Sequence, residues 1–258
     1  MKKQWKHRLP VILACVVLLP AVLAAVNSIP TWSLKTSGMS TLTGRFVTVC
    51  YEKESAAAKD VFQLADSKAP ELEKKLGLPQ NREVTVYIYD RQSTMQTKKY
   101  GYVAPLLGLD WYIGDNMGTK VILTSPAHPG KVHTYAQNKE AVLHEMVHTY
   151  ISILNPKIHL WLTEGMALYL SNGEPFYKEY LQDNRIPSCS DLRTGNPIRF
   201  SNMGGYLFAP TYIQYLDRQY GWSKVLQLVK TEDYQKTFGK TENQIYSGWV
   251  NWIENYYE

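Results

Sequence analysis

The pattern of apolar positions divides the chain into two parts of different character. Up to about residue 138, short stretches with alternating β-branched and aromatic residues are interspersed with stretches of helical spacing. This part predicts strands at 45–52 and 83–89, helices at 55–76 and 93–100, and a hairpin over 110–125. The second part predicts helices at 139–154, 160–171, about 175–182, 205–220, 222–230 and 241–256. The expected fold class is therefore α+β, with a small mixed sheet and its helices followed by a mainly helical C-terminal half.

Turn and capping residues refine these boundaries. Ser93 is expected to cap the short helix that ends near residue 100. In the hairpin, strands at 110–114 and 119–125 are predicted to flank a turn at Asn116-Met117-Gly118. Several helix-breaking residues between Asp183 and Gly205 predict a long irregular stretch, and a loop of that length is either functional or mobile.

The first 26 residues have the composition of a targeting or membrane segment. Four basic side chains among the first eight residues precede Leu9–Val26, a run without a formal charge. Its length fits an uncleaved membrane anchor, and the small residues near its end fit a cleaved secretory signal. Under either interpretation residues 27–258 are expected to be extracytoplasmic, because the basic flank stays in the cytoplasm. Residues 27–42, rich in Ser, Thr and Gly, are predicted to be a linker.

Composition and charge narrow the function classes. Hydrophobic residues make up 45% of the chain and aromatic residues 12%, which excludes wholesale disorder and fibrous repeats. The formal net charge is +5, but four of those charges lie in the first eight residues, so the remainder gives no hint of a nucleic-acid-binding surface. Outside the N-terminal segment, Cys50 and Cys189 fit either a disulfide or two thiols, and the sequence leaves both open.

The strongest chemical signal is the sequence His144-Glu145-Met146-Val147-His148. Residues four apart lie on one face of a helix, so both imidazoles are able to reach one Zn²⁺. Glu145 then lies beside the metal without binding it, where it can take a proton from the coordinated water. A catalytic zinc has three protein ligands as a rule. Glu164, a carboxylate in the otherwise apolar next helix, is the candidate for the third.

These residues resemble the gluzincin zinc metallopeptidases, and most closely the small bacterial peptidase MA-like domains. The segment Trp161-Leu162-Thr163-Glu164-Gly165-Met166-Ala167 is similar to the one that carries the third ligand in that family. The resemblance covers about residues 43–256 and implies a zincin-like metallopeptidase domain over 43–258. It implies that His144, His148 and Glu164 bind Zn²⁺, that Glu145 is the general base, and that Tyr206 steadies the oxyanion of the tetrahedral intermediate.

The chain departs from the thermolysin-like pattern at Leu168, where those enzymes place an acid that orients the first histidine. Another group is therefore needed to hold His144. Gly-Ala-Met-Glu-Asn, the segment by which aminopeptidases recognise an amino terminus, is also absent from the sequence, which favours an endopeptidase or a narrow-specificity peptidase. Tyr212, His133 and His159 remain alternative oxyanion or substrate donors.

The sequence thus predicts an extracytoplasmic zinc peptidase that acts on a peptide or protein substrate and contacts the membrane through its N-terminal segment if that segment is uncleaved. As in zincins, the substrate is expected to add a strand to a sheet edge, for which the hairpin 110–125 is the candidate. One alternative is a catalytically silent zincin-fold binding module, against which the intact Glu145 argues. The other is a metal-dependent hydrolase of a non-peptide substrate.

Overall fold

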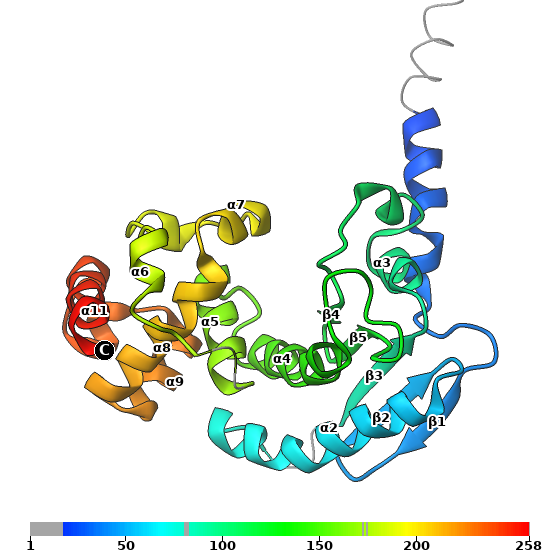
Figure 1. The fold of residues 1–258 in the computed structure, drawn as a ribbon, viewed down its shortest axis with the longest axis horizontal. Coiled ribbons are helices and arrows are strands. Elements are labelled where there is room, and N and C mark those ends of the chain that lie inside the picture. The colour runs from blue at the N-terminus through cyan, green and yellow to red at the C-terminus, as the bar shows by residue number, and fades with distance from the viewer. Residues whose placement is uncertain (1–17, 80–82, 172, 174, 258) are drawn as a thin grey trace, which may run out of the picture.

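A computed structural model describes residues 18–79, 83–171, 173 and 175–257. Its first part is built from a five-stranded sheet and the helices that flank it (Figure 1). In chain order these elements are η1 (Ile29–Trp32), β1 (Ser40–Thr43), β2 (Val47–Tyr51), α2 (Ser55–Leu76), β3 (Val84–Tyr89), α3 (Gln92–Tyr100), η2 (Ala104–Leu107), β4 (Gly114–Met117) and β5 (Lys120–Thr124).

In the second part, every regular element among the described residues is a helix. Its elements are α4 (Tyr135–Leu154), α5 (Leu160–Leu170), α6 (Tyr180–Asp183), η3 (Asp191–Arg193), α7 (Pro197–Asn202), α8 (Gly205–Tyr220), α9 (Trp222–Thr231), α10 (Tyr234–Phe238) and α11 (Glu242–Tyr256). The α+β prediction, with a small mixed sheet first and a mainly helical half second, is confirmed.

The strands lie in the order β1-β2-β3-β5-β4, so the hairpin supplies an edge strand, β4. The three central strands are parallel and both edge strands are antiparallel to their neighbours. The predicted position of the hairpin turn is wrong. Met117 pairs with Lys120, and the turn is the two residues between them, where Gly118 has φ +61°. A left-handed backbone at that position is what a tight hairpin requires.

The edge strand β1 was not predicted from the sequence. Ser40 pairs with Tyr51 and Thr43 with Thr48, so the last three residues of the predicted linker 27–42 belong to the sheet. Three of the four β1 side chains are exposed, and the strand therefore lacks the alternation of buried and exposed positions that reveals other strands.

The helix that carries the His-Glu-x-x-His sequence, α4, begins four residues before its predicted start. Thr134 and Gln137 form a capping box, in which Thr134 Oγ1 accepts from the Gln137 N–H and Gln137 Oε1 accepts from the Thr134 N–H. This reciprocal pair satisfies two backbone donors that would otherwise lack partners.

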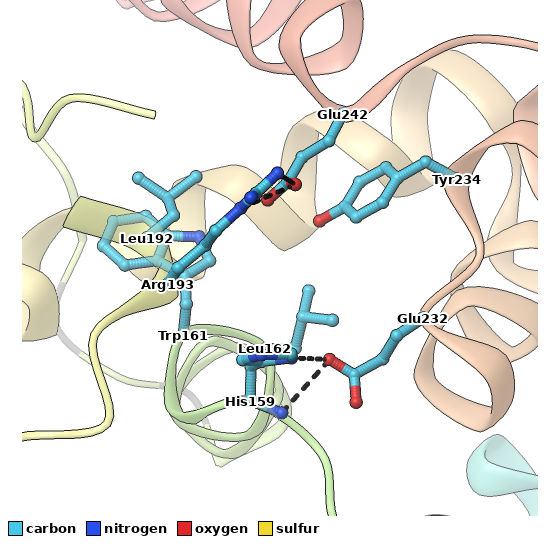
Figure 2. Close-up of a pocket in the computed structure, with 8 residues that line it drawn as sticks. All are labelled: His159, Trp161, Leu162, Leu192, Arg193, Glu232, Tyr234 and Glu242. Atoms are coloured by element: carbon cyan, nitrogen blue, oxygen red, sulfur yellow. Dashed lines mark hydrogen bonds and ion pairs between the residues drawn. The ribbon is translucent and has the colours of Figure 1, made fainter. Parts of the chain in front are cut away.

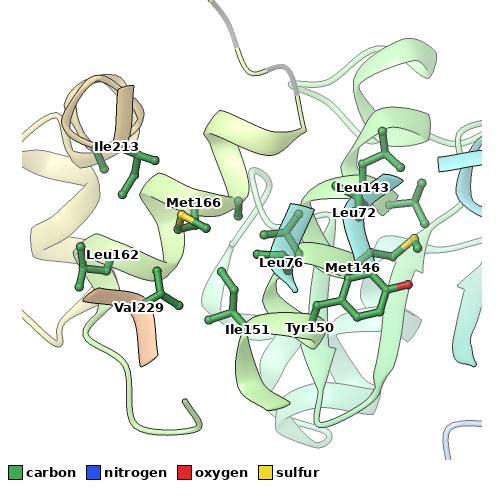
Figure 3. Close-up of a cluster of buried hydrophobic side chains, with 14 of the residues drawn as sticks. Leu72, Leu76, Leu143, Met146, Tyr150, Ile151, Leu162, Met166, Ile213 and Val229 are labelled. Carbon is green, nitrogen blue, oxygen red and sulfur yellow. The ribbon is translucent and has the colours of Figure 1, made fainter. Parts of the chain in front are cut away.

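The stretch 142–151 of α4 is largely buried between other elements. It packs against α2, α5, β4 and β5. Figure 3 shows Met146, Tyr150 and Ile151 directed into the apolar cluster that includes Leu72 and Leu76 of α2. Complete burial of each large apolar side chain contributes about 1.5–3 kcal/mol, so the helix is held firmly on several sides.

Helix α5 approaches α8 closely because residue 165 is glycine. A Cβ at Gly165 would lie 2.7 Å from the carbonyl oxygen of Ala209 and 2.9 Å from Cγ1 of Ile213. Neither neighbour is a flexible side-chain end, so any larger residue has to push the two helices apart.

We therefore expect Gly165→Ala to lower the free energy of unfolding by about 1–3 kcal/mol, as overpacking typically does. The measurement is the thermal unfolding midpoint of the apoprotein. Gly195→Ala is the matched control, because nothing lies within 4 Å of a Cβ built there. Equal midpoints for the two variants would contradict the close-approach argument.

Several local predictions differ from the structure. Helix α6 covers only the end of the predicted segment 175–182. The stretch 183–205 contains η3 and α7, and Asn196 caps α7 by accepting from two backbone N–H groups. Ser93 caps nothing, because α3 begins at Gln92 without a side-chain cap.

Of the two interpretations of the cysteines, the structure supports thiols. Cys50 is buried in β2, and Cys189 is a separate free thiol that donates to the side chain of Asn243.

The predicted N-terminal segment, residues 1–26, lies largely outside the described residues, which begin at 18. Residues 18–28 are helical. Within the described part of the chain, every helix is too short or too polar to be a candidate for crossing a membrane.

Candidate metal centre

Three predicted ligands meet between α4 and α5. His144 and His148 lie one turn apart on α4, and Glu164 lies in the middle of α5. The two Nε2 atoms are 3.0 Å apart. Glu164 Oε2 lies 3.4 Å from His144 Nε2, and its Oε1 lies 3.5 Å from His148 Nε2.

These separations fit zinc. Donor atoms bound tetrahedrally to Zn²⁺ at about 2.0–2.1 Å are about 3.3 Å from one another. Two imidazole nitrogens and a carboxylate oxygen are also the donor types that zinc takes in catalytic sites. Within the described residues, these three are the group with metal-ligand geometry.

Glu164 is kept ionised although it is buried. Burial acts to raise its pKa, but the neighbouring imidazoles of His144 and His148 outweigh burial and hold the pKa of Glu164 well below its usual range. Its Oε2 atom is buried and makes no hydrogen bond of good geometry. A cation shared with both imidazoles would satisfy this oxygen.

The orientation of His148 depends on a residue that sequence reasoning missed. Nδ1 of His148 lies 2.9 Å from the Thr163 hydroxyl, so the residue before Glu164 holds the second histidine. Such partners fix the ring and its tautomer. For Nδ1 of His144, no hydrogen bond is found among the described residues. The described residues therefore hold His144 through its Nε2 side alone.

Glu145 lies beside the ligands in a buried position. Burial raises its pKa to about 8, and the carboxylates of Asp115 and Glu164 act in the same direction. His144 and Lys99 act in the opposite direction. A carboxylate whose pKa lies near neutrality is suited both to accept and to return a proton.

The edge strand β4 contacts Glu145. A Cβ at Gly114 would lie 3.1 Å from Glu145 Oε1, so the absence of a side chain at Gly114 lets the carboxylate approach the strand. The next residue, Asp115, forms an ion pair of 2.8 Å with Lys99 of α3 and accepts from the hydroxyl of Tyr112. These contacts fix the strand next to the predicted general base.

Tyr206 lies in the first turn of α8, with its ring edge-on to Phe200 at a centroid distance of 5.0 Å. Much of the residue is exposed. Even so, burial of its hydroxyl, reinforced by Glu164 and Glu145, raises the pKa of Tyr206. The phenol is therefore protonated at neutral pH and lies within the electrostatic field of both carboxylates.

The alternative donors make contacts of their own. Tyr212 is fully buried and donates to Tyr234. His133 Nε2 lies 2.9 Å from the carbonyl oxygen of Trp111. His159 forms an ion pair with Glu232.

Figure 2 shows the surroundings of that ion pair. His159 and Glu232 line a cavity of about 200 Å³ together with Arg193, Glu242 and apolar side chains. None of the three clustered ligands lines this cavity, so His159 belongs to a different place on the surface.

Comparison with known proteins gives distant structural matches. No family model and no curated protein matches the chain. Among solved structures, it is similar to an M1 zinc metallopeptidase from Deinococcus radiodurans, with a TM-score of 0.45 and 11% sequence identity over 84% of this chain. A mutant of that enzyme matches with a TM-score of 0.43, 11% identity and 82% coverage. In both cases the chain spans 51% of the length of the matched protein.

Proposed function

We propose that this protein is an extracytoplasmic zinc-dependent peptidase with a zincin-like fold. The observation that carries the proposal is the convergence of His144, His148 and Glu164 at spacings that fit one zinc ion. Glu145 lies between the two histidines on α4, with its pKa raised toward neutrality. A cluster that only stored or tethered a metal would have no use for a buried base at that position.

When bound, zinc would polarise a water molecule and lower its pKa. Glu145 would accept the proton from that water at its carboxylate and would later return it to the leaving amine. His148 would be kept in position by Thr163 while these transfers occur. The Asp115–Lys99 ion pair would keep β4 in place beside Glu145.

The substrate in this proposal is an extended peptide that adds a strand to β4. Two observations support this placement: β4 is an edge of the sheet, and Gly114 on it contacts Glu145. Backbone pairing at such an edge provides affinity without demanding particular side chains. The scissile bond would then lie where the carboxylate of Glu145 meets the strand.

Tyr206 is the proposed donor to the oxyanion. We expect Tyr206→Phe to lower kcat by about 10²-fold or more with little change in KM or in zinc content, because a donor to developing charge acts in the transition state. Steady-state kinetics on a cleaved peptide provide the measurement. A structural role alone would instead lower the unfolding midpoint and leave kcat of the folded fraction unchanged.

The N-terminal segment bears on where this activity takes place. We propose that residues 1–26 direct the chain to the membrane, as an uncleaved anchor or a cleaved signal, and that residues 27–258 act outside the cytoplasm. The uncharged run Leu9–Val26 behind four basic residues supports this placement.

Metal removal tests the proposed chemistry. The purified protein should contain one zinc per chain and cleave members of a peptide library. A chelator should stop cleavage, and added Zn²⁺ should restore it. Zinc without cleavage of any peptide would favour the binding module, and activity confined to esters or cell-wall amides would favour the non-peptide hydrolase.

A further inference from the structure

The loop that follows α3, here called the η2 loop (residues 102–107), exposes apolar side chains to an unusual degree. Leu106 is 84% exposed and Leu107 60%, and Tyr102 and Val103 are also exposed. The chain carries no formal charge from Tyr100 to Leu109. Isolated exposed apolar residues are ordinary, but a contiguous exposed group marks a surface that contacts another phase or molecule.

Hydrogen bonds attach this loop to the end of the N-terminal helix. The side chain of Asn27 donates to the carbonyl oxygen of Tyr100 at 3.1 Å and accepts from the backbone N–H of Val103 at 3.0 Å. The carbonyl oxygen of Asn27 accepts from the Tyr102 N–H at 3.2 Å. At Gly101 the loop approaches Asn27 so closely that no side chain fits there: a Cβ would lie 2.2 Å from the carbonyl oxygen of Asn27. Gly101 also has φ +87°, which favours glycine. The loop and the helix therefore form one local unit.

The described part of the N-terminal helix, residues 18–28, also exposes apolar side chains. Figure 1 shows this helix (blue) rising from the body of the molecule beside α3. The η2 loop, which follows α3, lies on the same side of the molecule as the helix. The described part of the helix exposes Leu18, Leu19, Val22, Leu23 and Val26. Just beyond it, Trp32 is 73% exposed. Aliphatic residues bordered by exposed Trp and Tyr are typical of protein surfaces at a lipid interface.

We propose that the η2 loop is a second membrane contact, inserting Leu106 and Leu107 into the lipid surface next to the point where the N-terminal helix enters it. This inference rests on the proposed membrane placement of residues 1–26 and is independent of the peptidase chemistry. The occupant is a lipid bilayer because the apolar loop is joined to the helix at 18–28. The sequence leading into that helix, Leu9–Val26 behind four basic residues, has the composition and length of a membrane segment.

The contact has a consequence for the candidate metal centre. Lys99, just before the loop, pairs with Asp115 on β4, and β4 lies against Glu145. A loop held in the lipid surface would therefore orient β4 relative to the bilayer. The favoured substrates would then be extended segments that leave the membrane close by.

Site-directed fluorescence on the full chain tests the proposal. The chain would carry Cys15→Ser and Cys189→Ser, with Cys50 left buried in β2. An environment-sensitive fluorophore would be attached at Leu106→Cys, at Val22→Cys in the helix, or at Lys59→Cys on α2. Each protein would be reconstituted into phosphatidylcholine–phosphatidylglycerol vesicles with and without nitroxide-labelled acyl chains.

We expect labels at 106 and 22 to emit at shorter wavelength and to lose fluorescence with the nitroxide lipids, while the label at 59 responds to neither. A water-exposed label at 106 beside a quenched label at 22 would overturn the loop contact and leave the anchor intact. A label at 106 that is shielded from water but not quenched would indicate a protein partner and would also overturn it. Water exposure at both sites would reject anchor and loop together. Zinc content and peptide cleavage, measured separately, report on the proposed function.

Discussion

Replacing Glu145 with glutamine should leave one zinc ion per chain and reduce kcat/KM for peptide cleavage by about 10²–10⁴-fold, the usual contribution of a general base. Glutamine preserves the shape of the side chain but accepts no proton at neutral pH. Glu145 contacts Gly114 and is not one of the predicted zinc ligands, so its replacement should not weaken zinc binding. Metal analysis and kinetics on the same sample provide the measurement.

Glu140→Gln is the matched control for this variant. Glu140 lies on the same helix, one turn before His144, and is exposed. Its change should alter neither zinc content nor cleavage. Full activity in the Glu145 variant would reject Glu145 as the base, whereas loss of zinc together with activity would show that Glu145 supports the cluster instead.

The sequence was sufficient to predict α4 and the face that carries both histidines, because that information is local. Four-residue spacing on a helix brings His144 and His148 together whatever the rest of the fold does. Glu164 could be predicted for a different reason. A carboxylate in an apolar helix needs a partner, and the nearest unexplained group was the histidine pair.

The contacts around Glu145 could not be predicted because they depend on pairings between distant segments. Gly114 reaches Glu145 only because β4 pairs with β5 in the observed register, and the predicted turn was misplaced. The Lys99–Asp115 ion pair joins a helix to that same strand. Register and edge position are set by tertiary packing, which single-sequence patterns do not encode.

Thr163 is an intermediate case. It precedes Glu164 directly, so once α5 is placed against α4 its hydroxyl is a natural partner for His148. The sequence shows that Thr163 is present, but the rotation of α5 that directs its hydroxyl toward His148 depends on tertiary packing. The capping box at Thr134 and Gln137 is, in contrast, a local pattern. It precedes the predicted helix 139–154 because capping residues are polar and add nothing to the apolar spacing that predicts a helix.

The second large effect is expected from Glu164→Ala. Removing one of the three predicted ligands should lower zinc affinity by well over the 10–100-fold that loss of a supporting partner typically costs. The alanine variant keeps both imidazoles but loses the only anionic ligand, and with it the charge that balances the cation. Zinc titration monitored by competition with a chromophoric chelator measures the affinity directly.

The same variant should also lose the stabilisation that zinc confers. A ligand that binds only the folded state raises stability by RT ln(1 + [L]/Kd), so the zinc-dependent shift of the unfolding midpoint must shrink as Kd rises. Glu179→Ala, an exposed change near α6, should keep the full shift. Glu164→Gln should give a zinc-dependent shift between that of the wild type and that of Glu164→Ala, since its amide oxygen is a neutral and weaker donor to zinc. An unchanged zinc affinity in the alanine variant would remove Glu164 from the ligand set and require another third ligand.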